Sequence, residues 1–271
     1  QQGDVHEMAD EIFRVPHFSD SKAQHRTHCD KAKYKKMYDA ALSDPDAFWR
    51  EQAQRVDWFK PFSKVKEVSF HSPVSIKWFI DGKLNISYNC IDRHLPTRSN
   101  QTALIWEADH PDTPSQHITY QDLYRNVCRL ANSLKAMGIQ KGDRVTIYMP
   151  MIPEATYAML ACARIGAIHN VIFGGFSPDA IVDRIKDCES HFVITANEGL
   201  RGGKTIDLKK NMDIALNKCP EVKKVLVVKH TDHPTPMIQN RDYWYHDLTK
   251  SQAEHCPPEP MDAEDPLFIL Y

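Results

Sequence analysis

The sequence has no excess of charge of either sign and no long uninterrupted apolar run. Its 271 residues carry a formal net charge of −2 at pH 7, which argues against charge-driven binding to nucleic acid or to an acidic membrane surface. The most apolar stretch, residues 155–173, is interrupted by Arg164, Gly166 and His169. It therefore predicts a buried helix and strand rather than a membrane span. Any phosphate-binding site must therefore be a local cluster of basic residues rather than a broad basic surface.

The sequence also lacks the cysteine spacing of a disulfide framework or a zinc site. Its seven cysteines are an odd number and are dispersed, without a C-x-x-C pair. Several occupy apolar positions of predicted helices, which is typical of reduced core thiols in a cytoplasmic protein. His25, His28 and Cys29 come nearest to a metal cluster but lack a second pair of ligands. No basic stretch followed by an apolar run opens the chain, so we expect no signal peptide.

None of the short motifs that identify a reaction is present. The chain has no G-x-S-x-G, no H-E-x-x-H and no G-x-G-x-x-G at a strand end, and no carboxylate pair stands out as a catalytic dyad. From the motifs alone, no residue of this chain is assigned a catalytic role.

Strands and helices alternate over the C-terminal two thirds of the sequence. We predict strands at 102–108, 144–149, 167–173, 191–196, 224–229 and 267–271, and helices at 120–137, 154–164, from 177, and at 208–219. Strands that alternate with helices predict βαβ units, and hence an α/β fold with a largely parallel sheet flanked by helices on both faces. Residues 230–266 hold six prolines and predict a long connection.

Residues 1–100 are expected to form a separate, mainly helical or irregular N-terminal segment, with 101–271 as the first part of the next domain. Within this segment, residues 1–33 are expected to be loosely ordered. A helix is predicted from Pro45, and a packed lobe over 62–100 is predicted to contain a short helix near 86–95, ended by Pro96.

Two glycine-bearing turns follow predicted strands. GLRGGKT (199–205) resembles a phosphate-binding P-loop, but Glu198 stands where the P-loop consensus needs glycine. What is left is a flexible turn carrying Arg201 and Lys204, a pair suited to a phosphate monoester. The structural alternative is a solvated basic loop at a helix start. Lys209 and Lys210 follow this turn and are expected to be surface charges.

FGGFSPD (173–179) is the second such turn. Its paired glycines permit close approach of the backbone, while Ser177 and Pro178 cap and open a helix. A tight turn chosen for geometry alone is the structural alternative. Because both turns follow strands of one predicted sheet, both are expected at the same edge.

Several long segments resemble one family, in the family's order. DPDAFWREQAQRVDWFKPF, the stretch from ITYQDLY to FSPDAI, LRGGKTIDLKKNMDIAL and DAEDPLFILY are similar to the N-terminal part of the acetyl-CoA synthetases, within the adenylate-forming (AMP-binding) enzyme family. The resemblance covers the chain from about Tyr34 onward. It implies a cytoplasmic two-step ligase, in which acetate and ATP give acetyl-AMP and pyrophosphate, and CoA then displaces AMP.

The resemblance also implies where the substrates bind. It assigns a CoA site to Arg201, Gly202, Gly203, Lys204, Phe173, Gly174 and Gly175. The basic residues would meet the 3′-phosphate of CoA. Many relatives carry arginine where this chain has Lys204, so the positive charge is kept and the planar fork is lost.

Other parts of the family's site are expected beyond Tyr271. They are the loop for the ATP phosphates, the acetate pocket, the Mg²⁺ ligand and the lysine-bearing C-terminal lid. The partners implied are thus acetate, ATP, CoA and the missing C-terminal part of the same polypeptide, and the 271 residues alone are predicted to be inactive. The alternatives are another short-chain acyl-CoA synthetase such as one for propionate, a non-catalytic binding module, and a P-loop phosphotransferase.

Overall fold

A computed structural model describes residues 28–271, which belong to two compact units divided between Ala53 and Gln54. In the first unit, helix α2 (Lys31–Ser43) precedes α3 (Pro45–Gln52), and the Asp44 side chain caps α3 by accepting the N–H of Ala47. The helix at Pro45 is confirmed, whereas α2 was not predicted. Helix α2 begins at Lys31, inside the segment 1–33 that was expected to be loosely ordered, and residues 1–27 lie outside the described part.

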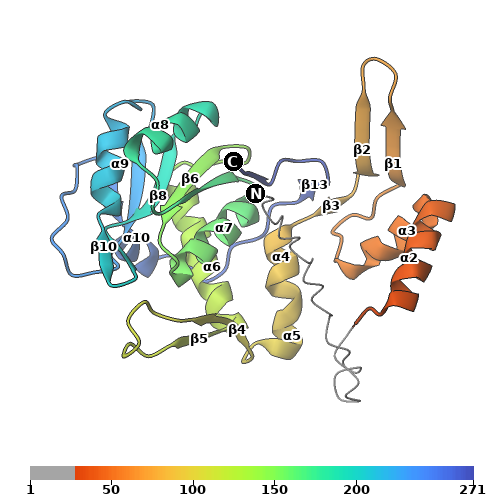
Figure 1. The fold of residues 1–271 in the computed structure, drawn as a ribbon, viewed down its shortest axis with the longest axis horizontal. Helices are drawn as coiled ribbons and strands as arrows, with labels where there is room; N and C mark the ends of the chain where they lie inside the picture. The colour runs from red at the N-terminus through yellow and green to blue at the C-terminus, as the bar shows by residue number, and fades with distance from the viewer. Residues whose placement is uncertain (1–27) are drawn as a thin grey trace, which may run out of the picture. The chain divides into compact units, whose positions relative to one another are not determined.

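The second unit is built on one six-stranded parallel sheet (Figure 1). Its strands are β6 (Arg144–Met149), β7 (Ile168–Phe173), β8 (Phe192–Ala196), β11 (Lys224–Val228), β12 (Asp242–Trp244) and β14 (Phe268–Ile269). They lie in the order β12-β11-β8-β6-β7-β14, and each neighbouring pair is parallel. The predicted fold class, α/β with a parallel sheet flanked by helices, is confirmed.

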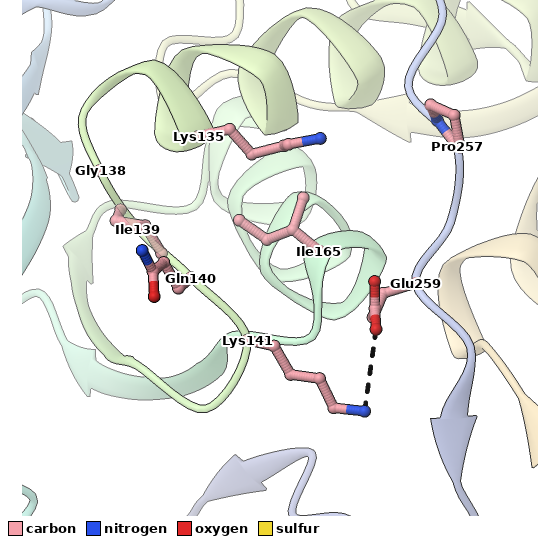
Figure 2. Close-up of a pocket in the computed structure, with 8 residues that line it drawn as sticks. All are labelled: Lys135, Gly138, Ile139, Gln140, Lys141, Ile165, Pro257 and Glu259. Atoms are coloured by element: carbon pink, nitrogen blue, oxygen red, sulfur yellow. Dashed lines mark ion pairs between the residues drawn. The ribbon is translucent and has the colours of Figure 1, made fainter.

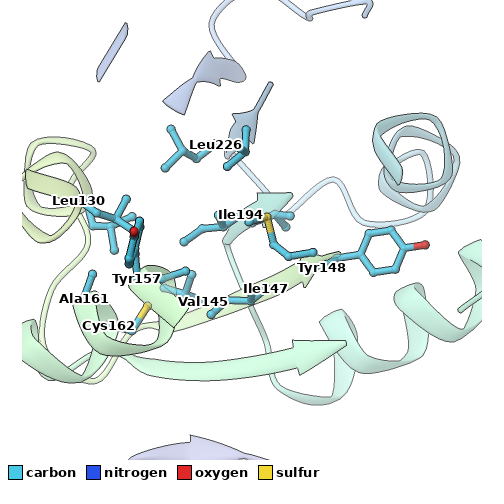
Figure 3. Close-up of a cluster of buried hydrophobic side chains, with 14 of the residues drawn as sticks. Leu130, Val145, Ile147, Tyr148, Tyr157, Ala161, Cys162, Ile194 and Leu226 are labelled. Carbon is cyan, nitrogen blue, oxygen red and sulfur yellow. The ribbon is translucent and has the colours of Figure 1, made fainter. Parts of the chain in front are cut away.

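Helices cover both faces of this sheet. Helices α6 (Tyr120–Ala136), α7 (Pro153–Ile165) and α10 (Tyr245–Lys250) lie on one face, and α8 (Pro178–Asp187) and α9 (Leu208–Leu216) on the other. Successive side chains of β6 point to opposite faces of the sheet. Val145 and Ile147 point toward α6 and α7, while Tyr148 points toward the other face (Figure 3). All three side chains are buried. None of the helices in the described part is long and apolar enough to cross a bilayer.

The helix ends follow the signals that the sequence carries. Thr119 and Asp122 form a capping box at the start of α6. Gly166, with φ +74°, closes α7 in the left-handed conformation that glycine adopts most readily. Ser177 accepts the N–H of Ala180 at the start of α8. These caps fix the lengths of the helices, and thereby where each following strand enters the sheet.

Two expectations in this unit were wrong in detail. The strand expected at 102–108, β4 (Thr102–Trp106), lies outside the parallel sheet and pairs antiparallel with β5 (Gln116–Thr119). The connection over 230–266 contributes β12 to the sheet. It also contains β13 (Met261–Asp262), which pairs antiparallel with β3 (Lys83–Leu84).

Residues 54–98 also differ from expectation. An antiparallel hairpin of β1 (Lys64–Ser69) and β2 (Ser75–Ile80) was not predicted. The single helix expected near 86–95 is instead a series of α4 (Ile86–Cys90), η2 (Asp92–His94) and α5 (Leu95–Arg98). Pro96 lies in the first turn of α5 rather than ending a helix, because the first turn needs no N–H from that residue.

Candidate nucleotide site

The two glycine-bearing turns meet at the carboxyl edge of the parallel sheet. One follows β7 and the other follows β8, and β6 lies between these strands. The chain reverses its direction of travel across the sheet there, which is where open α/β sheets bind ligands. The side chain of Arg201 lies over the ring of Phe173, with 5.0 Å between Cζ and the ring centroid. The structure therefore brings the two sequence-predicted groups of residues together.

The RGGK segment is a tight β-hairpin rather than a flexible loop. Strand β9 (Gly199–Arg201) pairs antiparallel with β10 (Lys204–Ile206), and Arg201 is the direct partner of Lys204. Gly202 and Gly203 form the two-residue turn with φ of +58° and +70°, as hairpin turns of this length require. Because the hairpin intervenes, helix α9 starts only at Leu208, so this turn is not a phosphate loop at a helix N-terminus.

Hairpin pairing places two cations side by side. Directly opposed residues of an antiparallel pair project from the same face, with Cβ atoms about 5 Å apart. Like charges in that position repel each other. Within residues 28–271, neither Arg201 nor Lys204 forms an ion pair with a carboxylate. Both side chains are exposed, so this face of the hairpin is suited to an anion with several oxygen acceptors.

Exposed aromatic rings adjoin the two cations. Phe173 is 50% exposed, and its ring meets that of Phe176 edge-on at 5.9 Å. The guanidinium of Arg184 lies 4.7 Å from the Phe176 ring centroid and 5.3 Å from that of Tyr271. A row of cations and rings thus extends from Arg201 to Tyr271. Such rings and guanidinium planes are surfaces on which a planar base can stack.

The FGGF turn is held by contacts from the strand beside it. The hydroxyl of Tyr148 donates to the carbonyl oxygen of Phe176 at 3.0 Å and to that of Gly174 at 3.4 Å. Burial raises the pKa of Tyr148, so the phenol keeps its proton. A Cβ on Gly174 would lie 3.0 Å from the carbonyl oxygen of Met149. Glycine is therefore required there for close approach of the backbone, as the sequence indicated.

Sequence reasoning was wrong about one lysine of this region. Lys210 is exposed, as expected, but Lys209 is buried. Its ammonium group lies 2.7 Å from a carboxylate oxygen of Asp213 and 2.8 Å from one of Asp242. Arg241 forms ion pairs with the same two carboxylates. This network holds the start of the long connection against α9, and Lys209 plays no part in the exposed cationic surface.

Glu198, which breaks the P-loop consensus, has its hydrogen-bond partner outside the hairpin. It is buried and accepts a hydrogen bond of 2.5 Å from the hydroxyl of Thr231. The N–H groups of Gly202 and Gly203 are also occupied, because each donates to a carboxylate oxygen of Asp109. This arrangement offers no backbone cradle for the phosphates of ATP.

Residues that sequence reasoning missed complete the candidate site. They are Asp109, Tyr148, Arg184 and Tyr271. Tyr148 was identifiable as an inward-facing residue of a buried strand. No pattern in the sequence linked Asp109 to a turn 93 residues away.

A cavity of about 310 Å³ lies at the opposite, amino-terminal edge of the sheet (Figure 2). Lys141 lines the cavity and is paired with Glu259 at 3.9 Å and with Asp265 at 3.2 Å. Its lining thus includes the paired Lys141 and a second lysine, Lys135. The candidate nucleotide site is an open surface rather than an enclosed pocket.

The described residues provide no metal centre. Within residues 28–271, no group of three or more His, Cys, Asp or Glu side chains is arranged to hold a metal ion. No residue is therefore assigned to the Mg²⁺ that the resemblance implies. The cysteines of this part of the chain are free thiols, and Cys128, Cys162, Cys188, Cys219 and Cys256 are buried.

Comparison with known proteins identifies the family. A family profile described as AMP-binding enzyme matches residues 91–271, and one described as acetyl-coenzyme A synthetase N-terminus matches residues 34–90. The chain belongs to the AMP-binding enzyme family. The recognition made from the sequence is thus confirmed, although the proposed division at residue 100 stays a prediction.

Individual AMP-binding relatives are also similar over most of the chain. An acetyl-coenzyme A synthetase of Bdellovibrio bacteriovorus is 59% identical over 97% of the chain, and one of Desulfatibacillum aliphaticivorans is 56% identical over 97%. The chain spans about 40% of the length of each. A solved structure of acetoacetyl-CoA synthetase from Streptomyces lividans superposes with a TM-score of 0.79, at 24% identity, over 92% of this chain and 38% of its own. That likeness supports the fold.

Proposed function

We propose that this chain is the N-terminal part of an ATP-dependent acetate–CoA ligase, and that its RGGK hairpin binds the 3′-phosphate of CoA. The reaction would join acetate and CoA through an acetyl-AMP intermediate, releasing AMP and pyrophosphate. The single observation that carries the CoA site is the pair Arg201 and Lys204, unpaired cations on one face of a hairpin beside the exposed ring of Phe173.

The chemistry of the ligand matches these groups. The nucleotide part of CoA combines a phosphate monoester with an adenine ring. The fork of Arg201 and the point charge of Lys204 suit the monoester, and the rings of Phe173 and Phe176 suit the base. Gly174 and Gly175 would let the ligand approach the backbone of the turn. No acid, base or nucleophile of the described residues is assigned a catalytic role.

Groups for the first half-reaction are proposed to lie in a part of the polypeptide beyond Tyr271. This rests on the share of the relatives' length that the chain spans. ATP, acetate and Mg²⁺ would bind there, and the 271 residues alone are proposed not to adenylate acetate. Acetate is the proposed acid because the similar relatives are named acetyl-coenzyme A synthetases. Propionate is the alternative.

Calorimetric titration of the chain with CoA and with dephospho-CoA tests the CoA site. We expect the chain to bind CoA more tightly, because only CoA has the 3′-phosphate. Arg201→Ala and Lys204→Ala should each weaken CoA binding by about tenfold, as expected for one charge-assisted contact, and leave dephospho-CoA binding unchanged. Lys210→Ala is the control, since Lys210 is also exposed and lies outside the hairpin. Equal affinity for the two ligands would overturn the assignment.

A second test uses the polypeptide extended to the length of its relatives. Arg201→Ala should raise the KM for CoA and leave acetate-dependent ATP–pyrophosphate exchange intact, since the hairpin would act only when CoA binds. Loss of exchange together with thioester formation would contradict a role confined to CoA.

A further inference from the structure

The hairpin that carries Arg201 and Lys204 is held at its tip by a residue distant in sequence. Asp109 lies in the loop between β4 and β5. One of its carboxylate oxygens, Oδ1, accepts the N–H of Gly202 at 2.6 Å, and Oδ2 accepts the N–H of Gly203 at 2.9 Å. Each oxygen of this carboxylate thus accepts a hydrogen bond from one of two successive backbone N–H groups.

The turn supplies those donors because of its conformation. Gly202 and Gly203 both have positive φ, and successive N–H groups in such a turn form a concave anion-binding arrangement. In this chain the anion is the protein's own carboxylate. A phosphate bound at the hairpin would therefore meet the side chains of Arg201 and Lys204, while the backbone donors hold Asp109.

The hairpin needs such an anchor. Its strands pair over only three residues each, and a two-stranded ribbon of that length is marginal in water by itself. Its two cations also repel each other across the ladder. Hydrogen bonds from Gly203 and Gly202 lower the pKa of Asp109, so the carboxylate stays ionised, and the contact is kept, at weakly acidic pH.

We propose that Asp109 is a positioning residue for phosphate recognition: its carboxylate fixes the Gly202–Gly203 turn and thereby sets Arg201 and Lys204 side by side. This inference rests on the proposed CoA site. The alternative is that the Asp109 carboxylate competes with the ligand, because it occupies the place that the phosphate would take. The two readings predict changes of opposite sign when the carboxylate is removed.

The decisive measurement is the ratio of affinities for CoA and dephospho-CoA in Asp109 variants of the chain. Asp109→Ala should weaken CoA binding by about tenfold, the scale of one misplaced charge-assisted contact. Dephospho-CoA binding should not change. Asp109→Glu keeps the carboxylate and should recover part of the ratio. Asp112→Ala, in the same loop and exposed, is the matched control and should behave as the unaltered chain.

Two results overturn the inference. An unchanged ratio in Asp109→Ala would mean that the turn positions its cations without the carboxylate, and tighter CoA binding would mean that Asp109 competes with the ligand. Failure of the proposed function is distinguishable, because the unaltered chain would then not discriminate between the two ligands. Amide hydrogen exchange of Gly202 and Gly203 gives a readout independent of ligand. Exchange that is no faster in Asp109→Ala would also overturn the anchor.

Discussion

Arg164 and Asp92 are joined by two hydrogen bonds of 2.8 Å, from Nη1 to Oδ2 and from Nη2 to Oδ1. The guanidinium is fully buried, and its Nε also donates to the carbonyl oxygen of Cys256. This pair therefore ties α7 of the parallel-sheet layer to η2 and to the connection that leads to the last strand. Three segments far apart in sequence share one buried charge.

Removing either partner of this pair should be strongly destabilising. Arg164→Leu leaves the Asp92 carboxylate without its counter-charge, and Asp92→Asn leaves a buried guanidinium, so each should lower the free energy of unfolding by about 3 kcal/mol. Urea denaturation measures the loss, and the double variant should lose less than the sum of the single losses. Arg125→Ala, which removes an exposed cation paired with Glu254, should cost about 0.5 kcal/mol or less. A double variant that loses the full sum of the two single losses would contradict direct coupling between Arg164 and Asp92.

Lys209 and Lys210 are neighbours in sequence, but replacing each should have a different effect on the free energy of unfolding. Burial alone would raise the pKa of Asp242, but hydrogen bonds from Arg241, the N–H of Ile238 and Lys209 lower it. Lys209→Met should therefore cost about 3 kcal/mol, because it removes one cation from a buried network, whereas Lys210→Met should change stability by about 0.5 kcal/mol or less. Thermal and urea unfolding of the two variants provide the check. Equal effects would mean that Arg241 alone neutralises both carboxylates.

The sequence predicted those parts of the fold that depend on local signals. The apolar run of β6 and the caps Thr119 and Gly166 are properties of adjacent residues, and the structure has these elements where they were expected. Lys209 was misassigned because its burial depends on Asp242, a partner more than 30 residues away. Strand β12 was missed for the same reason, since a three-residue edge strand acquires its identity only by pairing with β11.

The candidate site was predictable to the same extent. Arg201 and Lys204 were recognised as a pair because they flank two glycines, a pattern that is local. Their common face depends on the hairpin register, and the anchor at Asp109 depends on the fold of β4 and β5. Local spacing therefore identified which residues carry the charge, while tertiary pairing determines where that charge points.

Gly174 and Gly175 should respond differently to the same added methyl group. A Cβ at Gly174 meets the backbone carbonyl of Met149 at 3.0 Å, which cannot move without shifting β6, so Gly174→Ala should cost about 2 kcal/mol of stability. A Cβ at Gly175 meets the ring of Phe173 at 2.9 Å. That ring is exposed and can rotate, so Gly175→Ala should leave stability nearly unchanged.

The Gly175 variant should instead affect ligand binding. Rotation of the Phe173 ring would separate it from the guanidinium of Arg201. The free energy of CoA binding should therefore change by more than the free energy of unfolding. Calorimetric titration and urea denaturation of both alanine variants separate the two effects. A Gly175→Ala chain that binds CoA normally would indicate that the ring and the cation act independently.

His169 should make the chain sensitive to acid. Burial lowers the pKa of its imidazole to about 4, and within the described residues its Nδ1 has no hydrogen-bond partner. The ring of Phe268 stacks on it at 5.5 Å. An unfolded histidine binds its proton near pH 6.5, whereas the folded one stays neutral down to about pH 4. Between these values the unfolded chain binds more protons, so stability falls as the pH falls.

The size of this effect follows from the linkage relation. Each pH unit contributes about 1.4 kcal/mol, so the His169 contribution to stability should decline by about 2 to 3 kcal/mol between about pH 7 and about pH 4.5. Urea unfolding of the unaltered chain and of His169→Leu at both pH values isolates it, because carboxylate contributions are common to the two proteins. His117→Leu, which removes an exposed histidine, should keep the full pH dependence. If His169→Leu loses as much stability on acidification as the unaltered chain, the imidazole must be able to take up its proton in the folded state, and its neutrality beneath Phe268 would be excluded.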